Sequence, residues 1–114
     1  MKYRGSCHCG KVTFEFEGQI EGVVSCNCSI CAKRGSLLHF AARDALTVTG
    51  EQELTTYTFN KHVIKHRFCK TCGILPFGEG VDPKGVRTAA VNVRCLDDFD
   101  LATLKIHQYD GRNA

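Results

Sequence analysis

The stretch that decides the fold reads Phe68-Cys69-Lys70-Thr71-Cys72-Gly73. A Cys-x-x-Cys-Gly group forms a tight turn in which both sulfurs face one side, and the glycine supplies backbone freedom after the second thiol. A second group, Cys7-His8-Cys9-Gly10, places two cysteines at positions i and i+2, which share a face in extended chain. Together the groups supply four thiolates, enough to close a tetrahedral structural zinc site that ties the first strand to the middle of the chain.

Three further cysteines lie between these two groups, in the run Cys26-Asn27-Cys28-Ser29-Ile30-Cys31. Cys26 and Cys28 form another same-face pair, and a turn brings back Cys31 as a third sulfur. Three protein ligands with one vacant position are the arrangement by which zinc enzymes admit water or substrate. The seven clustered cysteines therefore predict two Zn²⁺ ions per chain, one in a closed four-cysteine site and one in an open three-cysteine site.

Other uses of the cysteines stay open at this stage. Cys95 or a histidine could complete the three-cysteine group, which would make two closed structural sites. Cys95 lies in a strand-like context that is typical of a small buried hydrophobic residue, and His66 is the histidine best placed as a ligand or proton shuttle. Disulfides are disfavoured, because Cys-x-Cys pairs bridge poorly and the chain shows no export signal.

The composition is that of an ordinary globular protein and leaves room for one domain, which we expect to span residues 1–114. The net charge of +3 comes from 15 basic and 12 acidic residues scattered along the chain, a distribution that argues against a nucleic-acid partner. No apolar run approaches the ~18 residues that span a membrane, and residues 1–7 contain no apolar core of a secretory signal. We therefore expect a cytoplasmic protein, in whose reducing compartment dense cysteine indicates metal.

The segments between the cysteines have the pattern of a β protein. Val12, Phe14 and Phe16 alternate with polar residues, which is the period of a half-buried strand. Segments rich in β-branched and aromatic residues predict further strands over 54–59, 63–68, 86–93 and 104–109. Glycines between the runs predict turns at Gly18, Gly22, Gly50, Gly73, Gly78, Gly80 and Gly85. Only residues 29–38 fit a single helical turn, so we predict a mainly β, antiparallel domain that is a monomer or, through its exposed sheet edges, a homodimer.

The order of the three cysteine groups resembles that of the glutathione-dependent formaldehyde-activating enzyme family, which includes centromere protein V. The resemblance covers nearly the whole chain. It rests on segments 5–10, 28–36 and 67–73 and on a tail in which 91–97 is followed by Tyr109-Asp110-Gly111-Arg112. Many members carry a histidine between the first two cysteines of the central group, where this chain has Asn27.

The resemblance implies an Mss-four-like β-tent fold of antiparallel sheets with cysteine-ligated zinc. It implies a structural zinc held by Cys7, Cys9, Cys69 and Cys72. It implies a catalytic zinc held by Cys26, Cys28 and Cys31.

The implied activity is that of a carbon–sulfur lyase of the S-(hydroxymethyl)glutathione synthase type, in which the thiol of glutathione adds to the small aldehyde formaldehyde. Glutathione carboxylates are then expected to bind near Lys33, Arg34, Gly35 and Ser36. The alternative is a non-catalytic, zinc-stabilised module that binds protein or chromatin.

Overall fold

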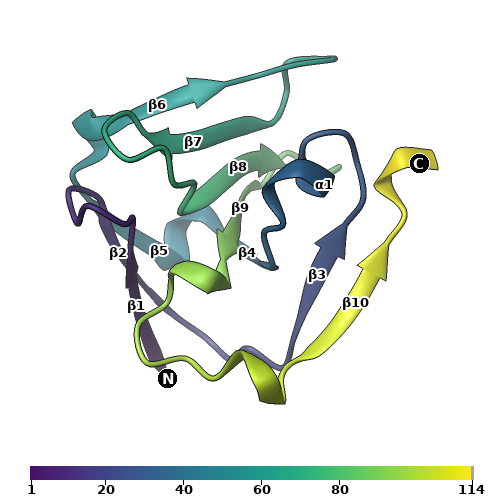
Figure 1. Cartoon of the computed structure of the whole chain (residues 1–114). Coiled ribbons are helices and arrows are strands. Elements are labelled where there is room, and N and C mark those ends of the chain that lie inside the picture. The colour runs from purple at the N-terminus through teal and green to yellow at the C-terminus, as the bar shows by residue number, and fades with distance from the viewer. Residues whose placement is uncertain (114) are drawn as a thin grey trace.

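The computed structural model describes residues 1–113, which form two β-sheets and one short helix (Figure 1). The smaller sheet has the order β1-β2-β5, with strands Lys2–Ser6, Thr13–Glu17 and Leu46–Thr49. The larger sheet has the order β10-β3-β4-β9-β8-β7-β6. Its strands are β3 (Gly22–Cys26), β4 (Leu38–Ala42), β6 (Leu54–Tyr57), β7 (Lys65–Cys69), β8 (Phe77–Val81), β9 (Arg87–Asn92) and β10 (Lys105–Tyr109).

Helix α1 is a single turn, Cys31–Arg34, as predicted for this segment, and it ends at Gly35 in the left-handed conformation. Short 3-10 helices make the remaining connections: η1 (Arg43–Ala45), η2 (Glu51–Glu53), η3 (Val93–Cys95), η4 (Leu101–Thr103) and η5 (Gly111–Asn113). Among residues 1–113, no helix combines the length and the apolar character that crossing a bilayer requires. The predicted mainly β fold is confirmed.

Two details of the prediction are wrong. The large sheet is mixed, because β10 runs parallel to β3 at one edge, with Tyr109 opposite Cys26 (Figure 1). Gly78 and Gly80 lie inside β8 and do not form a turn, and Gly22 begins β3. A parallel partner from the end of the chain cannot be read from local pattern, since it pairs segments that are far apart in sequence.

The two faces of the large sheet have different roles. Val91 and Phe77 are fully buried on the face that packs against the small sheet, and His39, opposite Val91, stacks on Phe16 of β2 with ring centroids 5.6 Å apart. Strand residues alternate between faces, so Gly78 and Ala90 lie on the other side. The same hydrophobic core includes the following buried residues: Val12, Phe14, Leu46, Leu54, Ala89 and Val93.

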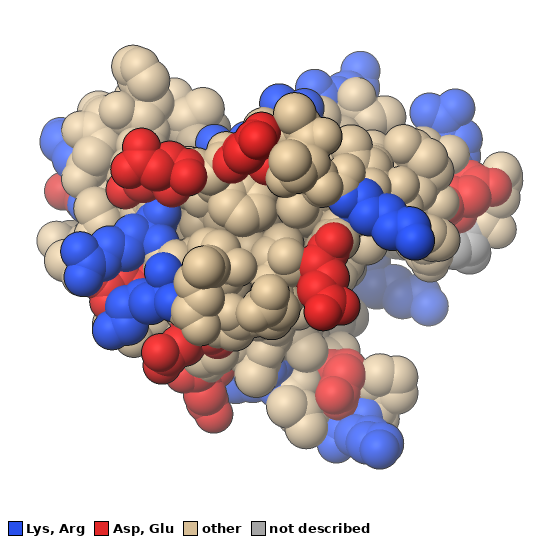
Figure 2. Space-filling model, turned by 90° about the horizontal axis from the view of Figure 1, so that it is seen from below, with Lys and Arg blue, Asp and Glu red and all other residues tan. Residues whose placement is uncertain are grey.

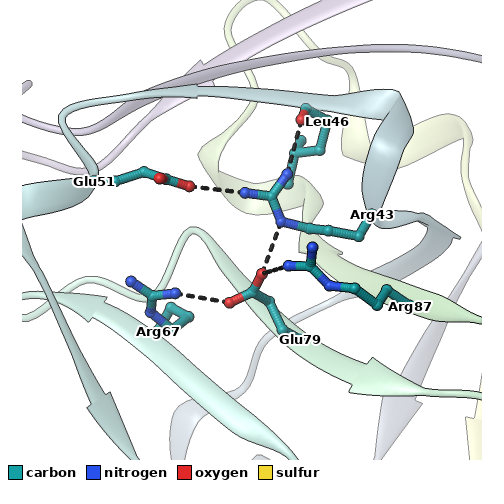
Figure 3. Close-up of polar contacts among 6 residues, drawn as sticks. All are labelled: Arg43, Leu46, Glu51, Arg67, Glu79 and Arg87. Atoms are coloured by element: carbon teal, nitrogen blue, oxygen red, sulfur yellow. Dashed lines mark hydrogen bonds and ion pairs between the residues drawn. The ribbon is translucent and has the colours of Figure 1, made fainter.

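A buried carboxylate joins several strands on the core face (Figure 3). Glu79 of β8 accepts hydrogen bonds of 2.7 Å from Arg43 Nε and from Arg67 Nη1, and Arg87 lies 3.4 Å away. Arg43 also donates to the carbonyl of Leu46 at 2.8 Å, which begins β5 of the small sheet. The network therefore connects the two sheets through one carboxylate.

Candidate metal centres and their cavities

The sulfurs of Cys7, Cys9, Cys69 and Cys72 lie within 4.8 Å of one another. The Cys9 sulfur is 3.6 Å from the sulfur of Cys7 and 3.6 Å from that of Cys69. One pair comes from the turn after β1 and the other from the turn after β7, so the group joins the small sheet to the large one. The structure brings together the four sulfurs that the spacing predicted.

Both pairs are presented by turns. Gly73 N–H donates to the carbonyl of Cys69 at 2.8 Å, and Gly10 N–H donates to that of Cys7 at 3.3 Å. The expectation that Cys7 and Cys9 share a face of extended chain is therefore wrong, because the chain has left β1 and turns back toward Val12. The turn still aims both sulfurs at one point.

Backbone N–H groups point at the sulfurs of this group. Burial opposes ionisation of Cys72, but the N–H groups of Ile74 and Cys9 outweigh it and lower the thiol pKa to about 6. At Cys9 the N–H of Lys11 favours the thiolate, yet desolvation and the neighbouring thiols of Cys69 and Cys7 raise the pKa to about 11. Only a cation could hold all four sulfurs ionised at neutral pH.

The second group consists of Cys26, Cys28 and Cys31, all half-buried, whose sulfurs also lie within 4.8 Å of one another. Cys26 ends β3 and Cys31 begins α1, so the end of a strand and the start of a helix place the outer two sulfurs. The N–H of Cys28 points at the Cys26 sulfur at 3.4 Å. Within residues 1–113, no fourth cysteine, histidine or carboxylate joins this group.

Thiol ionisation is strongly unequal in the three-cysteine group. Burial, followed by the neighbouring Cys28 and Cys26, raises the pKa of Cys31 to about 12. Burial also opposes ionisation of Cys28, but hydrogen bonds from Cys31 and Cys26 outweigh it and lower the Cys28 pKa. A thiol with a pKa of about 12 stays protonated at neutral pH, so the group needs a cation to carry three thiolates. Thiolate ligands in sets of three and four fit zinc, so both donor sets suit that metal.

The two residues weighed as a fourth ligand lie elsewhere. Cys95 is close to Cys7 and Cys72, and burial followed by these two thiols raises its pKa to about 11. Its sulfur faces the carbonyl of Leu75 at 3.7 Å, so it packs beside the four-cysteine group. His66 stays outside the three-sulfur group but lines the same cavity.

A cavity of about 200 Å³ opens beside the three cysteines. Arg34, Ser36 and His66 are its polar residues, and its other walls are mostly apolar. Burial, followed by the charge of Arg34, lowers the pKa of His66, so its imidazole is neutral at pH 7. His66 is stacked on Phe59 with ring centroids 5.4 Å apart, which fixes its orientation.

A second, polar cavity of about 580 Å³ shares Cys28 with the first. Lys33 and Arg112 supply its positive charge, and Asn60 and Ser29 contribute further polar atoms. The four residues expected near glutathione are thus divided: Lys33 lines the polar cavity, Arg34 and Ser36 line the apolar one, and Gly35 caps α1. The carbonyl of Gly35 accepts a hydrogen bond of 3.2 Å from Arg94 Nε.

The C-terminal segment covers one side of the three-cysteine group, which the sequence analysis missed. Asn27 donates to the carboxylate of Asp110 at 2.9 Å and accepts from the N–H of Arg112 at 2.9 Å. A Cβ at Gly111 would lie 2.6 Å from the Cys26 sulfur, so only glycine permits this approach. The tail motif was visible in the sequence, but its contact with Asn27 depends on the parallel pairing of β10 with β3.

Fold and site together define a mainly β protein with two cysteine clusters that could hold metal ions, one of them beside a cavity. The family model of the glutathione-dependent formaldehyde-activating enzyme matches residues 2–112. The chain belongs to this family, as its cysteine pattern predicted. It is also similar to a Rhodobacter sphaeroides protein of known crystal structure, with 32% identity and a TM-score of 0.80, over 93% of this chain and 98% of that one.

Proposed function

We propose that residues 1–114 act as one zinc-dependent domain that catalyses addition of the glutathione thiol to a small aldehyde, as an S-(hydroxymethyl)glutathione synthase-like carbon–sulfur lyase. The observation that carries this proposal is the three-cysteine group, with no fourth protein donor among residues 1–113, beside a cavity. A donor set of this kind leaves one coordination position for an exogenous ligand. The family's glutathione-dependent chemistry with formaldehyde is consistent with it.

The reaction forms a carbon–sulfur bond and converts the carbonyl to a hydroxyl, and the thiol proton ends on the new oxygen. A free thiol of pKa ~8.5 is only a few per cent thiolate at pH 7, so activation is needed. Zinc held by Cys26, Cys28 and Cys31 would supply it, by stabilising a thiolate or by polarising a carbonyl as a Lewis acid.

The proton is assigned to His66. It lines the cavity that contains the three cysteines, and its lowered pKa keeps it able to accept a proton at neutral pH. Stacking on Phe59 limits its motion. In the addition it would take the thiol proton and return it to the developing alkoxide.

The glutathione carboxylates are assigned to the polar cavity. Lys33 and Arg112 line it together with Cys28, so a thiol beside Cys28 can extend its charged ends toward both cations. Of the residues expected from sequence, Lys33 keeps this role in the proposal. Arg34 and Ser36 are assigned to the carbonyl side, since they line the other cavity.

The proposal is tested by measuring exchange between formaldehyde, glutathione and their adduct by nuclear magnetic resonance. The zinc-loaded protein should accelerate exchange above the uncatalysed rate, and Cys28→Ser should abolish that acceleration while the protein remains folded. Cys95→Ser is the control, because Cys95 lies beside the other cysteine group and should leave exchange unchanged. Absence of acceleration by the wild-type protein would contradict the proposal.

The non-catalytic module remains the second hypothesis, and the same measurement decides against it if exchange is accelerated. Such a module has no need of a cavity at the three cysteines. On the face seen in Figure 2, basic and acidic side chains are interspersed and form no single-sign patch of the kind that binds nucleic acid.

A further inference from the structure

The apolar cavity owes its existence to two small residues in the large sheet. In the strand register, Gly78 and Ala90 lie directly opposite each other, with His66 beside Gly78 and Phe40 beside Ala90. Directly paired residues share a face of the sheet, so a row of two small residues lies between two ring side chains. The missing side-chain volume leaves a hollow in this face.

The walls of the hollow are those of a site for an apolar group. Besides the cysteines and the polar residues already named, its lining includes Ile30, Leu38, Phe40, Phe59, Ile64 and Leu75. Apolar walls offer few hydrogen bonds to water, so water in such a space is held weakly and is readily displaced. A ligand group that displaces it gains the free energy of burying apolar surface.

The size of the hollow exceeds what formaldehyde requires. Its volume is about 200 Å³, whereas an engineered apolar cavity of about 150 Å³ admits benzene. Formaldehyde is a single carbon with no substituent, so it would leave most of the hollow unfilled. An aldehyde with a short alkyl or phenyl substituent would fill it.

We infer that the hollow formed by Gly78 and Ala90 binds the apolar substituent of the electrophile, so that the substrate class is an alkyl or aryl aldehyde. This inference rests on the proposed thiol addition and names its carbonyl partner. The sulfur bonds to the carbonyl carbon, the carbonyl π electrons pass to oxygen, and oxygen takes the thiol proton. The substituent stays unchanged in the hollow, while the glutathione carboxylates lie in the polar cavity beyond Cys28.

The first test needs no thiol and no turnover. Benzyl alcohol, the reduced form of benzaldehyde that no longer carries a reactive carbonyl, is titrated into the zinc-loaded protein, and amide shifts are followed by nuclear magnetic resonance. Saturable shifts should centre on Gly78 and Ala90. Gly78→Val should remove these shifts, because the valine side chain fills the hollow. The protein should tolerate the substitution, since a Cβ at this position meets only the Lys65 carbonyl at 3.6 Å, an ordinary contact.

Gly80→Val is the matched control for this variant. Gly80 lies two residues along the same strand and the same face, outside the hollow, and its Cβ would meet Thr88 Oγ1 at 3.5 Å. It should therefore leave the benzyl alcohol shifts in place. Ala90→Val fills the hollow from the neighbouring strand. It replaces Gly78→Val in the benzyl alcohol titration if Gly78→Val does not fold.

The second test compares S-methylglutathione with S-benzylglutathione by isothermal titration calorimetry. Burial of a phenyl-sized group should make the benzyl conjugate bind about 10- to 100-fold more tightly. Gly78→Val should reduce that ratio to less than about threefold and leave the S-methylglutathione affinity unchanged, because the glutathione portion lies in the other cavity.

The outcomes separate the inference from the proposed function. Equal affinities for the two conjugates, or no shifts at Gly78 and Ala90 with benzyl alcohol, overturn the apolar-substituent inference even if formaldehyde exchange is accelerated. Benzyl alcohol bound in the hollow, with neither conjugate bound, supports the apolar ligand and overturns the glutathione proposal. Tighter binding of the benzyl conjugate that Gly78→Val abolishes supports both.

Discussion

The carboxylate of Glu79 is buried and serves three arginines at once, Arg43, Arg67 and Arg87 (Figure 3). Replacing Glu79 by Gln should lower the free energy of unfolding by about 3 kcal/mol, because removing one partner of a buried ion pair leaves the other charge uncompensated. The measurement is urea denaturation of the zinc-loaded protein, with Glu15→Gln as control. Glu15 also pairs with two cations, Lys2 and Arg4, but it is 40% exposed, so its loss should cost less than about 1 kcal/mol. Equal losses in the two variants would contradict the structural role of Glu79.

The same residue predicts a pH dependence. Burial opposes the charge of Glu79, but the hydrogen bonds from Arg43 and Arg67 outweigh it and lower the pKa below its usual range. A carboxyl with a depressed folded pKa stabilises the protein above its unfolded pKa of ~4.3 and loses that contribution as the pH falls through the folded pKa. The stability difference between wild type and Glu79→Gln should therefore be full at pH 6 and shrink below pH ~4. A constant difference over this range would show that the charge is not its source.

Proton transfer at the cavity is the third prediction made at a single residue. His66→Gln keeps a polar side chain of similar size but cannot accept the thiol proton, so the exchange rate should fall about 100-fold or more. Zinc content should be unchanged, since His66 lies outside both cysteine groups. The S-methylglutathione affinity should also be unchanged, since His66 does not line the polar cavity assigned to glutathione. An unchanged rate would remove His66 from the mechanism.

At the scale of secondary-structure elements, the C-terminal segment, which consists of strand β10 and the 3-10 helix η5, contacts the three-cysteine group. Parallel pairing with β3 brings Gly111 against Cys26, and Asn27 holds the segment by hydrogen bonds to Asp110 and Arg112. Gly111→Ala would put a Cβ 2.6 Å from the Cys26 sulfur, so sulfur or segment must move. We expect the zinc affinity of the three-cysteine group to fall about 10- to 100-fold, the usual effect of disturbing an outer-shell contact.

This effect is measured by chelator competition on the purified protein, which does not depend on activity. Gly18→Ala is the control, because the nearest atom to its Cβ, in the Phe16 ring, is 4.0 Å away. The other zinc should be retained in both variants. If Gly111→Ala binds two zinc ions with wild-type affinity, the segment does not support the metal centre.

For the molecule as a whole, the two cysteine groups differ in what they connect. The four-cysteine group joins turns from different sheets, whereas Cys26, Cys28 and Cys31 belong to one short segment. A structural zinc contributes roughly 10–16 kcal/mol in small domains, comparable with a net stability of about 5–15 kcal/mol. Cys7→Ser should therefore abolish soluble folded protein, while Cys28→Ser should remain folded with one zinc. Metal analysis and circular dichroism measure this, and unfolding of both variants alike would overturn the division into structural and reactive sites.

The sequence by itself determined the cysteine groups and the mainly β class. Both are local: sulfur spacing fixes which thiols one turn can present, and period-two alternation marks strands such as the one containing Phe14 and Phe16. The two cysteine pairs of the four-cysteine group lie in separate turns. Because four thiolates suit one metal ion, the sequence also predicted that these two turns lie close together. The family pattern followed from the same local spacing and is confirmed over residues 2–112.

Only the tertiary structure decided what surrounds the two cysteine groups. The sequence pattern predicted a turn at Gly78. Gly78 instead lies in β8, where the strand register pairs it with Ala90, and these two small residues leave the hollow. Tertiary structure likewise brings Asn27 into hydrogen-bond contact with the C-terminal segment, and Glu79 into hydrogen-bond contact with Arg43. The Asn27 and Glu79 contacts join positions 83 and 36 residues apart, and the hollow also needs Phe40 and His66 from other strands. Such pairings follow from the packing of whole sheets, which the residues nearby in sequence do not encode.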